Sequence, residues 1–464
     1  MWPHSSPAHS RPDRVGKRAA NEGKQAAEWR ILSVLPYNTR GNLMVRARGL
    51  AVLIAATFVA FACGGTSSGG GSKGEIDIAS DLPVSGADAS SGLPTQQGAN
   101  FAVTRAGSVR NFTLKFVPFD DSVNGAHDAQ KGVQNVQAML SNSKILGMVG
   151  PFNSGVAKAE IPVANQAPLA MISPSNTNEC LTQTFDYCQA ANGFTPASLR
   201  PTGTNNYFRV AAADTFQGPA MADFAIKAGP PPAGLGITKV AVWDDEETFG
   251  QGVANNFAKE FTAKGGTVVD RKSYDPKAKK DFHDFLASAK DKGAQGIYLG
   301  ATSATGGCIA RGQMAGLFNP DIYYFGPDGI GDAQCLKDAG SMATSNMFAT
   351  QGVADATQNP SAKTITDAYS AAYPGSSNVG AYTFAGYDCA ALLIDAIGRA
   401  IDANGGNMPT RKQVIDALAK TTNFNGLTGV ISFDKNGDPA KPVLQLQQVK
   451  NGAWVFVTQF AQGA

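Results

Sequence analysis

One stretch of the chain, residues 145–178, limits the possible folds most strongly. It contains two short apolar runs, Ile145–Val149 and Leu169–Ile172, which are separated by a segment compatible with a helix and which each end in a small polar loop. This order predicts a strand, a helix and a parallel strand, so that both loops lie at the same edge of one sheet. In open α/β sheets, ligands bind outside the carboxyl ends of such strands.

Ser154 stands at the predicted start of the intervening helix, where unpaired N–H groups and the helix dipole favour an anion. The loop Gly150-Pro-Phe-Asn-Ser-Gly lacks the lysine and the spacing of a phosphate-binding loop. We therefore predict a position for a carboxylate group that is bound by neutral hydroxyls. The alternative is that Ser154 only caps its helix, as serine at a helix start commonly does.

The composition favours a globular chain of two domains. The 464 residues are 43% apolar and 16% charged, which is enough to bury more than one core. Nine Lys and Arg against three Asp and Glu precede Cys63, which leaves 30 basic and 34 acidic residues after it. That part of the chain has no basic field, so we expect no nucleic-acid partner.

The beginning of the chain has the features of an export signal. Residues 1–43 are polar and basic, and we expect them to be disordered or to be an extension upstream of a misassigned start. Residues 44–62 combine a basic start with an apolar core that is too short to span a bilayer. With Cys63 following, the arrangement resembles a bacterial lipoprotein signal in which Cys63 is lipidated; an ordinary secretory signal is the alternative. Residues 63–74 are predicted to be a flexible Gly/Ser tether.

From Glu75 onward, predicted strands and helices alternate, which indicates a parallel α/β domain. A polar insertion over residues 179–206 separates this series from a second, similar one that begins at Lys239. Two closing strands are expected near residues 443–449 and 454–460. The pattern therefore predicts two domains of the same kind.

Five cysteines follow Cys63, and in an oxidising compartment we expect them to form disulfides. We predict that Cys180 pairs with Cys188 and that Cys308 pairs with Cys335. Cys389 lies in an apolar helical pattern, where a buried free thiol is expected.

The residues needed for enzymatic chemistry are missing from the exported part. Its two histidines, His127 and His283, have no motif around them. From Glu75 onward there is no Gly-x-Ser-x-Gly nucleophile elbow and no zinc-protease motif. The cysteine spacing fits no zinc site. We therefore predict a protein that binds without catalysis and that carries no metal or cofactor.

Several motifs occur in an order that points to one family. They are Asp81-Leu-Pro-Val-Ser-Gly, Gly150-Pro-Phe-Asn-Ser, Met171-Ile-Ser-Pro-Ser-Asn-Thr, Phe249-Gly and Phe325-Gly-Pro-Asp-Gly-Ile-Gly. With them, the chain resembles the type I periplasmic substrate-binding proteins of the branched-chain amino acid (Leu/Ile/Val) ABC transporter family.

The resemblance implies an α/β fold of two Rossmann-like lobes with parallel-sheet cores, joined by three crossings that act as a hinge. The ligand is clamped between the lobes. The first lobe is expected to comprise residues 75–208 and 352–429, and the second lobe residues 209–351 and 430–464.

The resemblance also implies six ligand-binding residues. On the first lobe, Ser154 and Thr177 would offer hydroxyls and Ser175 a backbone group to the ligand carboxylate. On the second lobe, Phe249 matches a position that is usually Tyr, and Thr302 one that is often aromatic. Asp328 matches a position where the family typically has Glu facing the ligand ammonium. The alternative for Asp328 is turn formation only.

These observations lead to one functional prediction. We expect an extracytoplasmic monomer, lipid-anchored to the outer face of the cytoplasmic membrane or free in the periplasm. It would bind an amino acid, branched-chain or otherwise neutral, and pass it to the permease subunits of an ABC importer. The alternatives are an amide, a small organic or aromatic acid as ligand, or a sensory ligand-binding protein.

Overall fold

The computed structural model describes residues 71–231, 233–375 and 379–462, which belong to one compact unit. The predicted extension (1–43), the signal peptide (44–62), Cys63 and most of the tether (63–74) lie outside the described residues.

Six strands form the first sheet in the order β2-β3-β1-β6-β7-β8. Neighbouring strands are parallel, except β2 and β3. The strand, helix and parallel strand predicted over residues 145–178 are present as β6, α3 and β7. The strands are β1 (Glu75–Leu82), β2 (Ser108–Val109), β3 (Phe112–Asp120), β6 (Ile145–Val149), β7 (Ala170–Ser173) and β8 (Tyr207–Arg209).

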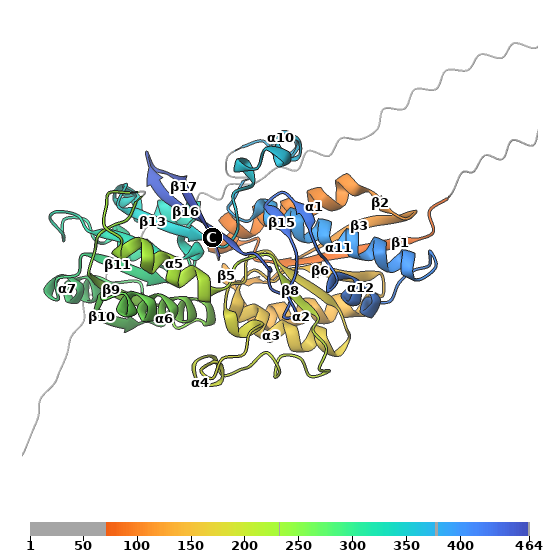
Figure 1. The fold of residues 1–464 in the computed structure, drawn as a ribbon, viewed down its shortest axis with the longest axis horizontal. Helices are drawn as coiled ribbons and strands as arrows, with labels where there is room; N and C mark the ends of the chain where they lie inside the picture. The colour runs from red at the N-terminus through yellow and green to blue at the C-terminus, as the bar shows by residue number, and fades with distance from the viewer. Residues whose placement is uncertain (1–70, 232, 376–378, 463–464) are drawn as a thin grey trace, which may run out of the picture. The chain divides into compact units, whose positions relative to one another are not determined.

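Helices cover both faces of this sheet because both faces of its strands are apolar. Ile76 and Ile78 of β1 face the core under α1, α11 and α12, whereas Ala79 faces the core under α2 and α3. In Figure 1, α1 lies above the strands and α2 and α3 lie below them. The helices are α1 (Ala89–Ala106), α2 (Ala129–Ser141), α3 (Ser154–Gln166), α11 (Thr383–Ala403) and α12 (Arg411–Leu418).

The second sheet has seven strands in the order β10-β9-β11-β12-β13-β16-β17. The first five are parallel, and the closing strands β16 and β17 add to them in antiparallel fashion, next to β13 (Figure 1). The strands are β9 (Lys239–Asp244), β10 (Thr267–Ser273), β11 (Gly296–Gly300), β12 (Tyr323–Gly326), β13 (Met347–Gln351), β16 (Val443–Lys450) and β17 (Ala453–Ala461).

Successive side chains of β9 point to opposite faces of the second sheet and so belong to two different cores. Val240 and Val242 face α5 and α6, whereas Ala241 and Trp243 face α7, α8 and α9. The helices are α5 (Asp214–Ile226), α6 (Thr248–Ala263), α7 (His283–Asp291), α8 (Ile309–Gly312) and α9 (Ala333–Ala339). Each sheet with its helices is called a lobe below, and the predicted α/β fold with two such units is confirmed.

The short hairpin of β14 (Phe424–Gly426) and β15 (Gly429–Ile431) lies with the first lobe. The buried Asp388 of α11 accepts hydrogen bonds from the backbone N–H groups of Leu427 and Thr428, at 2.7 and 2.8 Å. Ile431 and Phe433 then pack in the first core. The expected boundary between residues 429 and 430 therefore does not mark where the chain leaves this core.

The smaller elements lie in the connections. The hairpin of β4 and β5 follows β3, α4 lies in the insertion over residues 179–206, and α10 precedes α11. They are β4 (Ser122–Val123), β5 (Ala126–His127), α4 (Cys188–Asn192) and α10 (Lys363–Ala372).

Both predicted disulfides are present. Cys180 is bonded to Cys188 in the insertion, Cys308 is bonded to Cys335 in the second lobe, and Cys389 is a buried free thiol. The cysteine assignment made from the sequence is thus confirmed.

Replacing both Cys180 and Cys188 by alanine is expected to lower the free energy of unfolding by about 2–3 kcal/mol, because the bond closes a short loop and restricts the unfolded chain. The two residues are only 8 positions apart. Because a disulfide stabilises less when its loop is short, this loss is small among disulfides. Urea unfolding followed by circular dichroism measures this change. If the variant and the parent protein were equally stable, the disulfide would not form in solution.

Candidate functional site

Hydrogen bonds join the two loops that follow β6 and β7. The Ser173 hydroxyl donates to the carbonyl oxygen of Pro151 at 2.7 Å. The Ser175 hydroxyl and the Asn176 side-chain amide donate to the carbonyl oxygen of Phe152, at 2.9 and 2.6 Å. Because β6 and β7 are parallel neighbours, these loops form one surface at the carboxyl edge of the first sheet.

Ser154 is the first residue of α3, and its buried hydroxyl oxygen accepts a 3.4 Å hydrogen bond from the backbone N–H of Asn178. Asn153 holds the N-cap position. The hydroxyl of Ser154 is therefore tied to the loop after β7 and does not cap its own helix. The first N–H groups of an α-helix have no partner within the helix, so the start of α3 can receive an anion.

Thr177 lies between these contacts. Its hydroxyl is buried and makes no hydrogen bond of good geometry among the described residues, although it lies close enough to Asp214 to act against the raised pKa of that carboxyl. Its carbonyl oxygen accepts a 2.7 Å hydrogen bond from the backbone N–H of Asp214, at the start of α5. A buried hydroxyl without a partner is costly, so this group is available to a ligand.

Ser175, in contrast, is already engaged. Its backbone N–H donates to the Ser173 hydroxyl at 3.3 Å, and its own hydroxyl donates to Phe152. Of the three residues predicted on the first lobe, Ser154 and Thr177 thus offer side-chain oxygens, and Ser175 connects the two loops.

Arg209, at the end of β8, supports this loop from within the core. The side chain is fully buried, and it donates to the carbonyl oxygens of Asn176 and Asn178 at 3.3 and 2.8 Å and to Asp438 at 2.7 Å. Burial opposes the ionisation of Asp438, but Arg209 lowers the pKa of that carboxyl below its ordinary value. Arg209 therefore fixes the backbone on both sides of Thr177.

On the second lobe, Asp328 follows β12 in the loop that was predicted to face the ligand. Its carboxylate accepts a 2.6 Å hydrogen bond from the Gln217 side chain and another of 2.6 Å from the Tyr382 hydroxyl. Burial raises the pKa of Asp328 to about 6, although these two hydrogen bonds act in the opposite direction. The group is more than a turn residue, since its side chain connects three segments.

Asp214 adds a second acidic side chain beside Asp328. Gln217 donates to both carboxylates, and one oxygen of Asp214 has no partner among the described residues. Burial, and then the charges of Glu179 and Asp328, raise the pKa of Asp214 well above its ordinary value. This part of the second lobe therefore favours a cationic group.

Phe249 and Thr302 lie on the second lobe, near the loop that carries Asp328. Phe249 is the second residue of α6, and a side-chain carbon added to Gly329 would lie 2.7 Å from its ring. The ring is therefore beside the Asp328 loop. The Thr302 hydroxyl lies 3.2 Å from the Thr305 hydroxyl and takes part in the turn after β11.

Contacts between the lobes bring the two sets of residues together. The Asn178 side chain donates to the carbonyl oxygen of Thr248, next to Phe249, at 2.9 Å. Tyr382, which immediately precedes α11 of the first lobe, reaches Asp328 of the second. Tyr382 and Gln217 were not among the residues predicted from the sequence, because no motif surrounds them and both lie far from Asp328 along the chain.

His127 makes a further bridge between the lobes. Its two ring nitrogens lie 2.8 Å from Asp88 of the first lobe and 2.9 Å from Glu247 of the second. Burial disfavours the imidazolium, but these two carboxylates raise the pKa of His127 well above the ordinary 6.5. His283 is exposed.

Replacing His127 by glutamine is expected to lower the free energy of unfolding by about 2 kcal/mol at pH 6, because hydrogen bonds to charged groups are lost. Folding raises the pKa of this imidazole, so its protonated form stabilises the folded protein. This stabilisation is complete at pH values below the pKa of the unfolded chain, and it is lost as pH rises through the pKa of the folded protein. The difference between the two proteins should therefore shrink above neutral pH. Urea unfolding at pH 6 to 10 tests this, and a difference that does not change with pH would contradict the charged bridge.

The chain is similar to known proteins in sequence and in fold. The chain is similar to "Leu/Ile/Val-binding protein homolog 3" of Brucella melitensis, with 26% identity over 82% of this chain and 92% of that protein. The crystal structure of a leucine-binding protein from Thermotoga maritima matches with a TM-score of 0.69 and 25% identity, over 83% of this chain and 98% of that one.

A branched-chain amino acid substrate-binding protein from Streptococcus pneumoniae, solved in complex with isoleucine, matches with a TM-score of 0.67 and 23% identity, over 83% of this chain and 99% of that one. Within the described residues, no helix has both the length and the apolar character needed to cross a bilayer. The family profile described as periplasmic binding protein matches residues 75–453. The chain therefore belongs to the periplasmic binding protein family.

Proposed function

We propose that this protein binds a neutral amino acid, branched-chain or similar in size, between its two lobes and delivers it to an ABC importer. One observation carries the proposal. The hydroxyls of Ser154, at the start of α3, and of Thr177, in the loop after β7, lie on one lobe, and the Asp328 carboxylate lies on the other. The two sides therefore suit the two charges of an α-amino acid. The Leu/Ile/Val-binding relatives support the same ligand class.

Binding proceeds in two steps in this proposal. The ligand carboxylate first meets Ser154 and Thr177 on the open first lobe. Closure then brings Phe249 over the aliphatic chain and Asp328 to the ammonium, with Thr302 and Ser175 shaping the surrounding loops. The contacts of Asn178 with Thr248 and of Tyr382 with Asp328 hold the lobes together, and only this closed form would offer the permease a paired surface.

Three crossings would form the hinge for this closure. The chain passes between the sheets after β8, after β13 and again between Phe433 and β16. We propose that residues 210–213, 352–355 and 434–442 absorb the change in backbone angles. Export and lipid attachment at Cys63 belong to the same proposal; mass spectrometry of the membrane fraction tests them, with Cys63→Ser as the variant that should release the protein.

A set of matched ligands tests the binding proposal. Leucine should bind in isothermal titration calorimetry and raise the melting temperature, since a ligand of the folded state stabilises it. The same skeleton without the ammonium, 4-methylpentanoate, and without the carboxylate, 3-methylbutylamine, should each bind at least about 100-fold more weakly. Binding of 4-methylpentanoate as tight as that of leucine would remove the role assigned to Asp328.

A further inference from the structure

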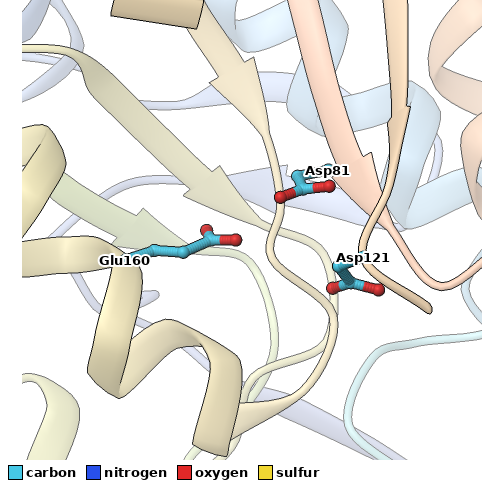
Figure 2. Close-up of side chains that lie close together, drawn as sticks. All are labelled: Asp81, Asp121 and Glu160. Atoms are coloured by element: carbon cyan, nitrogen blue, oxygen red, sulfur yellow. The ribbon is translucent and has the colours of Figure 1, made fainter. Parts of the chain in front are cut away.

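Three carboxyl groups lie together at the carboxyl edge of the first sheet. Asp81 belongs to β1, Asp121 follows β3, and Glu160 lies in the middle of α3. One oxygen from each residue lies within 4.8 Å of the others, and Figure 2 shows the three side chains around a common space. All three residues have no solvent exposure. We call them the acidic cluster.

The partners of these oxygens set the cluster apart from an ordinary buried network. One oxygen of Asp81 accepts a 2.8 Å hydrogen bond from the Asn135 side chain. No donor among the described residues reaches the second oxygen of Asp81 or either oxygen of Asp121 and Glu160. The carboxyl groups of Asp81 and Glu160 lie close enough to share a hydrogen bond when one of them is protonated. Glu160, fully buried, points toward the other two groups (Figure 2). Buried ionised carboxylates without a donor cost several kcal/mol each, so the cluster must either hold protons or bind a cation.

The protein supplies little of that charge itself. Lys131 and His127 act on the cluster only through longer-range charge, and His127 already lies between Asp88 and Glu247. Burial raises the pKa of Asp81 to about 7 and that of Glu160 well above its ordinary value. The neighbouring acids Asp88 and Asp120 add further negative charge.

The packing of the helices confines Glu160. A side-chain carbon added to Gly132 of α2 would collide with the Glu160 carboxylate and would lie 2.7 Å from the side chain of Val156. Only glycine at this position lets α2 approach α3 with the carboxylate between them. Glu160 is therefore held against the edge of the sheet and cannot turn toward water.

We propose that Asp81, Asp121 and Glu160 bind one calcium ion. All donors are carboxylate oxygens, the ligands that hard divalent cations prefer. Oxygens on opposite sides of a calcium ion lie about 5 Å apart, so one ion can reach all three groups. The ion would connect the ends of β1 and β3 to α3, the helix that begins at Ser154. The site is separate from the amino-acid site and does not depend on it.

Calcium titration of the full chain after EDTA treatment tests the site. Calcium chloride should release or absorb heat in isothermal titration calorimetry and raise the melting temperature by several degrees, without any amino acid present. Glu160→Gln should weaken calcium binding at least tenfold, and Asp121→Asn should do the same. The control Asp367→Asn removes an exposed acid paired with Lys363 and should leave calcium binding unchanged.

The same experiment can also contradict the calcium site. If the untreated and EDTA-treated proteins melt at the same temperature and calcium up to about 1 mM has no effect, the proposal is wrong. A higher melting temperature of Glu160→Gln in EDTA would then show that the cluster holds shared protons instead of an ion.

Discussion

Replacing Asp328 by asparagine is expected to lower the affinity for leucine at least about 100-fold at pH 7.5, because a buried ammonium would lose its carboxylate partner. Asparagine keeps the size of the side chain and can still contact Gln217 and Tyr382. Isothermal titration calorimetry measures the loss. The control Asp291→Asn changes an exposed acid at the end of α7 and should leave the affinity unchanged.

The same variant should stabilise the protein when no ligand is present. Burial raises the pKa of Asp328 from 3.8 to about 6, so the folded state binds more protons than the unfolded state between these values. The free energy of unfolding therefore falls as pH rises from about 4 to 6, because Asp328 must then ionise in a buried position. At neutral pH the total loss reaches about 3 kcal/mol. Urea unfolding should show Asp328→Asn to be more stable than the parent at pH 7, with little difference at pH 4.

A second comparison separates binding from folding in this experiment. Asp328→Asn should reduce the preference for leucine over 4-methylpentanoate, since both now meet a neutral side chain. Unchanged discrimination between these two ligands would place the ammonium elsewhere, with Asp214 as the next candidate because one of its oxygens has no partner among the described residues.

Replacing Arg209 by methionine is expected to lower the free energy of unfolding by about 3–5 kcal/mol, because Asp438 would remain as a buried charge without its partner. The carbonyl oxygens of Asn176 and Asn178 would also lose their donor. Since Thr177 lies between these two residues, the affinity for leucine should fall as well. Urea unfolding and calorimetry measure the two effects.

The double variant Arg209→Met with Asp438→Asn gives the matched control, since it removes both charges and should recover part of the stability. Arg110→Met breaks an exposed pair with Asp402 and should change little. Similar losses for Arg110→Met and Arg209→Met would contradict the special role of the buried arginine.

Several features could be predicted from local sequence. The apolar runs around residues 145–178 predicted β6, α3 and β7, because parallel strands buried on both faces have continuous apolar sequences. The two disulfides could be predicted because Cys180 and Cys188 close a short loop, and because the apolar helical pattern around Cys389 set that thiol apart from Cys308 and Cys335. The family resemblance pointed to Ser154, Thr177, Phe249 and Asp328, and their contact with a ligand stays a prediction.

Other features required distant segments to meet. The hydrogen bonds from Leu427 and Thr428 to Asp388, beside the expected boundary near residue 430, cannot be read from the hairpin sequence. The bridge through His127 was also missed, since its partners Asp88 and Glu247 lie on different lobes and no motif connects them.

The sequence by itself determined the alternation of strands and helices, the cysteine pairs and the hydroxyl-bearing loops at the sheet edge, because each depends on residues that are close along the chain. The tertiary structure decided which groups surround Asp328, which arginine supports Thr177 and where three buried carboxylates gather. These contacts form only when packing brings together side chains from separate helices and strands, so their charges and hydrogen bonds are set by the fold.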